Sequence, residues 1–144
     1  MERDYVSEFE KAFVGRACSI EREPPFWRAN FGDTFTMAFR SPWRIITTGR
    51  IAFGDEDDGH WFGLPAPLDG LERSASLLRR HVVQSVQLDR ETGDLRILFN
   101  GDTRIDVFNH SCGYEGWDAF YVAKGERWQV IAMGGGEIAV VPGD

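Results

Sequence analysis

Alternation of apolar and polar side chains is clearest in the second half of the chain. Leu95, Ile97 and Phe99 recur at every second position, which predicts a strand with one buried face. Asn100-Gly101 follows at once and is typical of a tight hairpin turn. Similar patterns predict strands at residues 82–88, 104–107, 119–122, 128–132 and 137–141. Short strands in succession, joined by turns, indicate an antiparallel sheet.

The first half of the chain combines helices with shorter strands. Tyr5, Phe9 and Phe13 recur every four residues, which predicts a helix over residues 4–14. A capping box of Ser7 and Glu10 would place its start inside that run. Short strands are expected at residues 17–20, 34–39 and 43–53, the last with a bulge at Gly49. Residues 21–25 should end the first of these, since proline has no N–H for a ladder.

A second helix is expected in the middle of the chain, over residues 70–80. Asp69 has a side chain suited to the N-cap position. Leu71, Ala75 and Leu78 recur at helical spacing and should form its inner face. The chain therefore contains one mid-chain helix and one short N-terminal helix among its predicted strands.

The composition fits a single hydrophobic core. The chain has 144 residues, of which 42% are hydrophobic and 13% aromatic, values too high for a disordered protein. No repeat, linker or low-complexity stretch divides it. We predict one domain over residues 1–144, of the α+β class and mainly β. Its expected architecture is a curved antiparallel sheet or half-barrel packed against the mid-chain helix.

The net charge of −7 narrows the classes of partner. Nucleic-acid and anionic-membrane binding both need clustered Lys and Arg, so neither is expected. An acidic chain suits a basic protein partner. The start of the chain does not resemble a signal peptide, and no apolar stretch reaches the ~18 residues of a membrane helix. We predict a cytoplasmic protein with Cys18 and Cys112 as free thiols, although the sequence leaves their pairing open.

An acidic run is the most unusual local feature. It consists of four consecutive carboxylates, which are Asp55, Glu56, Asp57 and Asp58. They could simply form a solvated loop, or they could steer a basic partner towards the protein. Trp61 follows closely and is a suitable anchor residue for an interface. We predict that these five residues form a partner-binding site. The run echoes part of a calcium loop, but the terminal Glu is missing and no metal is expected.

Candidate catalytic groups are few and scattered. His60, His81 and His110 lack a second ligand at a suitable spacing. Cys112 lies close to His110, but we do not expect this pair to be catalytic. Residues 134–136 are three glycines followed by a predicted strand, which favours a bend over a phosphate loop. We therefore predict no enzymatic activity and no cofactor.

Several short segments carry a resemblance to a known group of proteins. They are Leu77-Leu78, residues 93–101, Tyr114-Glu115-Gly116-Trp117 and residues 135–140. In this order they resemble small bacterial β-rich proteins that look like the immunity proteins and stand-alone domains found beside polymorphic toxins. The resemblance covers the C-terminal two-thirds of the chain. It implies inhibition of a toxin by binding, and it carries no catalytic residues.

Three hypotheses about function follow. The leading one is an immunity-type protein that neutralises a cognate toxin, for example a nuclease, through its acidic surface. The second is a small-molecule-binding, barrel-like protein with an aromatic cavity. The third is a structural module that forms a homodimer through an exposed strand edge.

Overall fold

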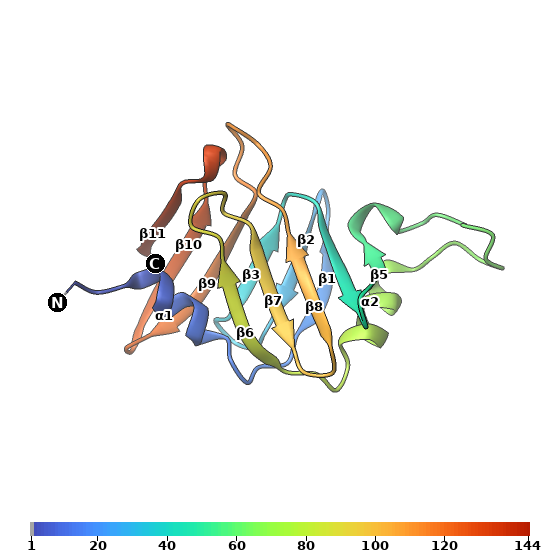
Figure 1. The fold of residues 1–144 in the computed structure, drawn as a ribbon, viewed down its shortest axis with the longest axis horizontal. Helices are drawn as coiled ribbons and strands as arrows, with labels where there is room; N and C mark the ends of the chain where they lie inside the picture. Colours follow the sequence, from blue (N-terminus) through green and yellow to red (C-terminus); the bar gives the residue numbers. More distant parts are fainter. Residues whose placement is uncertain (1) are drawn as a thin grey trace.

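Eleven strands form two antiparallel sheets in the computed structural model, which describes residues 2–144 (Figure 1). The six-stranded sheet has the order β1-β2-β3-β9-β10-β11, with bounds Ser19–Glu23, Phe26–Asn30, Thr36–Phe39, Trp117–Ala123, Glu126–Ala132 and Ile138–Pro142. The five-stranded sheet has the order β5-β4-β8-β7-β6, with bounds Arg50–Gly54, Trp43–Thr47, Thr103–Val107, Leu95–Phe99 and Val83–Leu88. Neither sheet closes into a barrel, and the predicted α+β, mainly β class is confirmed.

The two sheets share one core. Large side chains from both inner faces are fully buried, among them Trp43 of the five-stranded sheet and Trp117 and Tyr121 of the six-stranded sheet. Phe9 and Phe13 join this cluster from the N-terminal helix α1 (Tyr5–Ala12). The hydrophobic faces predicted from period-two alternation therefore meet one another, as expected for two half-solvated sheets.

Each helix covers one side of the space between the sheets (Figure 1). Helix α1 contacts β6 and β9, and helix α2 (Gly70–Leu78) contacts β1, β4 and β5. Asp69 is the N-cap of α2, as predicted, and accepts hydrogen bonds from two backbone N–H groups. The predicted inner face of α2 is correct at Leu78, which is buried, and wrong at Leu71 and Ala75, which are exposed. Gly70 and Ser74, one position earlier, are buried instead.

Two segments differ from the sequence-based prediction. The predicted strand over residues 43–53 is a hairpin, because Thr48 and Gly49 both have positive φ and reverse the chain. The irregularity in its pairing lies at Ile45 and Ile46, and not at Gly49. The first strand was expected to end at residues 21–25, but residues 21–23 belong to β1 and only residues 24–25 end it. They form a turn that leads directly into β2, a strand that the prediction missed.

The start of α1 gives the first testable prediction. Asp4, and not Ser7, is the N-cap, and its carboxylate accepts hydrogen bonds from the Ser7 N–H and Oγ and from Arg90. These bonds lower the pKa of Asp4 to about 2. A lowered pKa in the folded state adds stability above pH ~3.8, and that stability is lost as the pH falls towards 2.

Replacing Asp4 by Asn should therefore lower the unfolding midpoint in urea at pH 7. The difference from the wild type should shrink between pH 4 and pH 2, where the Asp4 carboxylate becomes protonated. Urea titrations at a series of pH values measure this. A difference that stays constant down to pH 2 would show that the Asp4 charge does not contribute.

Among residues 2–144, no helix combines the length and the apolar character that crossing a membrane would require.

Candidate protein-binding site

A narrow loop over residues 59–68, here called the finger, projects sideways from the sheets (Figure 1). Its base is closed by two backbone hydrogen bonds, from the Gly59 N–H to the Leu68 carbonyl (2.7 Å) and from the Leu68 N–H to the His60 carbonyl (2.8 Å). At its tip the Leu64 N–H bonds to the Trp61 carbonyl over 2.7 Å. These bonds hold the finger as a hairpin-like projection.

The tip of the finger has an unusual backbone. Phe62 and Gly63 have φ values of +44° and +75°, the pattern of a type I′ turn. Glycine adopts this region freely, but a bulky residue such as phenylalanine seldom does. The ring of Phe62 stacks on that of His60, with centroids 5.4 Å apart. A largely exposed phenylalanine with a strained backbone suggests a role outside the folded core.

The finger is anchored firmly where it meets the rest of the protein. On its N-terminal side the finger follows Asp58, whose carboxylate accepts the Gly70 N–H over 2.8 Å. On its C-terminal side it leads into α2 at Gly70, which is buried against Phe53 and Trp27. A Cβ there would lie only 2.8 Å and 2.9 Å from these two rings, so glycine allows the close approach. The base of the finger is thus part of the core, although its tip is in solvent.

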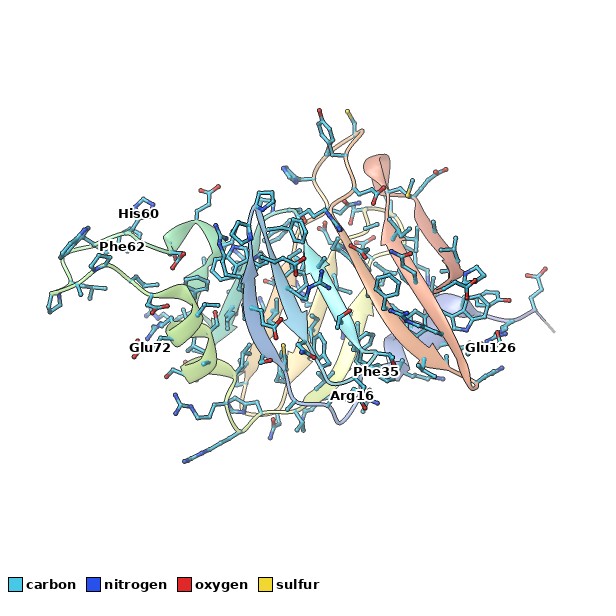
Figure 2. All side chains as sticks on the ribbon, turned by 180° about the vertical axis from the view of Figure 1, so that it is seen from behind. Arg16, Phe35, His60, Phe62, Glu72 and Glu126 are labelled. Atoms are coloured by element: carbon cyan, nitrogen blue, oxygen red, sulfur yellow. The ribbon has the colours of Figure 1, made fainter. Side chains whose placement is uncertain are left out.

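Large apolar side chains cover the tip. Trp61 is 57% exposed, Phe62 64% and Leu64 46%. Pro65, Ala66 and Pro67 follow and are also exposed. Isolated apolar residues on a surface are ordinary, but a contiguous set on a projection indicates a contact site. Figure 2 shows Phe62 and His60 at the far end of the molecule from Glu126.

A hollow of about 410 Å³ lies between the finger and α2. Its walls come from the finger (Leu64, Pro67, Leu68) and from the first turns of the helix (Asp69, Glu72, Arg73, Ser76). Glu72 is exposed, and it points outward beside the finger in Figure 2. Apolar side chains and the carboxylate of Glu72 therefore border the same hollow as the guanidinium group of Arg73, whose Nε–H donates to the Ala52 carbonyl over 3.2 Å.

The structure places the four predicted carboxylates at the base of the finger, in a short 3₁₀ helix η1 (Asp55–Asp57) and the residue after it. Three of them also hold the backbone. The Asp55 carboxylate accepts the Trp43 N–H over 3.3 Å, and that of Asp57 accepts the Gly54 N–H over 2.8 Å. Asp58 bonds to Gly70, as described above. Of the four carboxylates, only that of Glu56 accepts no hydrogen bond within residues 2–144, and Glu56 is also exposed.

The carboxylates are therefore not equivalent. Partial burial raises the pKa of Asp55, and the hydrogen bond from Trp43 opposes that shift only in part. Asp55 should lose its charge at a higher pH than an ordinary aspartate. Glu56 and Glu72 are the acidic side chains of this region that are free to meet a partner, whereas Asp55, Asp57 and Asp58 supply charge from fixed positions.

Sequence reasoning found part of this site. It selected the four carboxylates and Trp61, which the structure brings to one end of the molecule. It missed Phe62, Leu64 and Glu72. The sequence did contain a signal for these apolar residues. Bulky apolar side chains cluster with Gly and Pro just after the acidic run, and such a segment is too short and too irregular to be buried as a strand.

Other candidate groups do not assemble into a second site. His60 lies on the finger, His81 packs against Gly101, and His110 is exposed on another loop. Cys18 is buried and Cys112 exposed, and both are free thiols. Residues 134–136 form a bend before β11, as predicted, with Gly135 and Gly136 at positive φ. Within residues 2–144, no three His, Cys, Asp or Glu side chains are grouped as a metal site would need.

Comparison with known proteins gives no relative. No family model matches the chain, and no match was found among curated proteins or among solved structures.

Proposed function

We propose that this protein captures a basic protein partner through the finger and its acidic base, and that it acts as an immunity-type inhibitor of a toxin. The observation that carries this proposal is the combination of an exposed Trp61-Phe62-Leu64 tip with carboxylates at its base. Aromatic side chains are the usual anchors of protein interfaces. Surrounding carboxylates accelerate the encounter with a partner of opposite charge.

The shape of the site supports a macromolecular partner. A projecting tip can enter a cleft, whereas a small ligand is normally held in a concave pocket. The hollows found along the described chain, of about 190 to 590 Å³, open to solvent. The space between the sheets is occupied by the side chains of the core. These features favour surface capture over the alternative of an enclosed small-molecule site.

A toxin nuclease would fit this chemistry. The cleft of such an enzyme is basic where it meets phosphate, and an apolar finger with acidic flanks could fill and neutralise it. An interface of standard size buries about 800 Å² on each partner, which requires surface beyond the finger itself. Helix α2 adjoins the finger, so its exposed face, with Glu72, would extend the contact area. As part of the same proposal, the protein acts in the cytoplasm of the cell that produces it.

The homodimer alternative stays a prediction. Strand β11 is an edge strand of the six-stranded sheet and ends at Pro142, which cannot donate to a neighbouring strand. Light scattering of the purified chain measures its molecular mass in solution, which distinguishes a monomer from a homodimer.

The proposal is tested by affinity capture from the native cell, with the wild type and a finger variant as parallel baits. A suitable variant carries Trp61→Ser and Phe62→Asn. A protein retained only by the wild type is then purified and its binding and toxicity are measured in isolation. A toxin whose activity the wild type blocks supports the proposal. A toxin that binds both baits equally well contradicts the role of the finger.

The free carboxylates give a separate prediction. Replacing Glu56 and Glu72 by Gln should slow association with the partner several-fold at low salt and leave the dissociation rate nearly unchanged. The wild-type association rate should also depend more steeply on salt. Stopped-flow or surface-plasmon kinetics at several salt concentrations measure this. Glu56 and Glu72 are suitable because neither holds the backbone.

Glu126→Gln is the matched control, since Glu126 is an exposed acid at the far end of the molecule (Figure 2). The control removes one negative charge without touching the finger. If it slows association as much as Glu56→Gln alone, the effect arises from overall charge and the acidic base has no special role.

A further inference from the structure

A cluster of arginines lies on the outer face of the five-stranded sheet. Arg44, Asp106 and Arg96 are direct partners across β4, β8 and β7, so they form one row on that face. Arg104 lies two residues before Asp106 on β8 and therefore points the same way. Three guanidinium groups thus surround one carboxylate.

Asp106 holds these groups together. Its carboxylate accepts hydrogen bonds from Arg44 Nε at 3.1 Å and from Arg104 Nε at 3.0 Å, and it lies 3.6 Å from Arg96 Nε. The Asp106 side chain is only 6% exposed, whereas the three arginines are 34% to 55% exposed. Because the bonds use Nε, the terminal N–H groups of the arginines remain free for a ligand in the described structure.

Within the group, the carboxylate of Asp106 faces three guanidinium groups, and two further carboxylates, those of Asp89 and Asp94, lie nearby. Arg104 lines a separate hollow, whereas Arg44 and Arg96 line a hollow of about 310 Å³ that is also bordered by Asp89 and Asp94. Their carboxylates accept backbone N–H groups of the neighbouring turn and of Asn109, which fixes them at that end. An anion would therefore sit over the arginines and away from this turn.

We propose that Arg44, Arg96 and Arg104 form a binding site for an oxyanion of the phosphate type. Guanidinium groups bind phosphate oxygens in pairs, and groups held around one carboxylate on the same sheet face can do so together. Phe108 lies under Arg44, with the guanidinium 5.0 Å from the ring centroid. Phe108 and Leu88 also line the hollow and offer an apolar surface beside the charged group. The ligand class is a small phosphate or phosphate monoester.

This site is separate from the finger. Its residues lie on the exposed faces of β4, β7 and β8, and the finger residues lie beyond β5. The proposal does not depend on the partner of the finger, and a variant of one surface should leave the other intact.

Calorimetric titration of the purified full chain with inorganic pyrophosphate tests the proposal. Binding should be saturable with one site, and Arg96→Gln should weaken it about tenfold or more. Arg96 is the safest substitution because it makes no hydrogen bond to Asp106, so the Arg44–Asp106–Arg104 contacts remain. NMR shifts of the arginine Nε–H groups should move with the same affinity.

Arg79→Gln is the matched control, because Arg79 is an exposed arginine at the end of α2. No measurable binding of pyrophosphate, or equal weakening by Arg79→Gln and Arg96→Gln, would overturn the proposal. Inorganic phosphate and phenyl phosphate serve as further probes. Tighter binding of phenyl phosphate identifies an organic monoester lying on Phe108, and equal affinity identifies the free anion as the ligand.

Discussion

A double variant of the finger, Trp61→Ser with Phe62→Asn, should weaken binding of the protein partner by roughly 100- to 1,000-fold. Each anchor of this kind typically contributes about 2 kcal/mol or more to an interface, and tenfold in affinity corresponds to about 1.4 kcal/mol. Both side chains are largely exposed in the free protein, so their loss removes contact area from the complex and little from the fold. Surface plasmon resonance or calorimetry with the purified partner measures the change.

The stability of the same variant separates binding from folding. Asn tolerates positive φ better than Phe, so the turn at residue 62 should be no less favourable than before. The unfolding midpoint should therefore match or exceed that of the wild type. If the variant loses binding but also unfolds at markedly lower denaturant, a damaged fold explains the loss. If it binds the partner as tightly as the wild type, the finger is not the interface.

The periodicity of the sequence predicted most strands but not their partners. The strand at Thr36–Phe39 pairs with residues 117–120, as in the pair Thr36 and Phe120, far apart in the chain. Alternation of side chains identifies a buried face and says nothing about which strand lies next to it. The division into two sheets depends on these long-range pairs. Local turn signals such as Asn100-Gly101, by contrast, were sufficient for the hairpin that follows β7.

The finger was only partly predictable for a related reason. Composition identified the acids and Trp61, because charge and aromatic character are visible in the sequence. The reversal at Phe62-Gly63 was not visible, since type I′ turns are usually marked by Asn or Gly at the first position. The double role of Asp55, Asp57 and Asp58 was hidden as well. Their hydrogen bonds reach Trp43, Gly54 and Gly70, and only the folded chain shows which carboxylate remains free.

The same contacts change how the acidic run should be tested. Removing all four carboxylates would also remove the acceptors of three backbone N–H groups, including the one at the start of α2. A buried donor left without a partner costs about 1–3 kcal/mol. Loss of binding would then have two causes that kinetics alone cannot separate. Glu56 and Glu72 avoid this ambiguity.

Replacing Trp117 by Ala should have the largest effect on stability, about 3–5 kcal/mol. Trp117 is fully buried in β9, stacks on Phe9 of α1 with centroids 5.7 Å apart, and donates its Nε1–H to the Gly93 carbonyl over 2.8 Å. It therefore links α1, the six-stranded sheet and the turn before β7. Since small domains are stable by only about 5–15 kcal/mol, this loss is a large fraction of the total. Urea unfolding followed by circular dichroism measures it.

Trp117→Phe distinguishes the two contributions of this side chain. The smaller ring keeps an aromatic contact with Phe9 but removes the donor to Gly93, so we expect a loss well below that of the alanine variant. Tyr114 is the neighbouring control, because it is 83% exposed and its replacement by Ala should leave the unfolding midpoint nearly unchanged. If Trp117→Ala were no more destabilising than Tyr114→Ala, the two sheets and α1 could not share the core that positions both proposed binding surfaces.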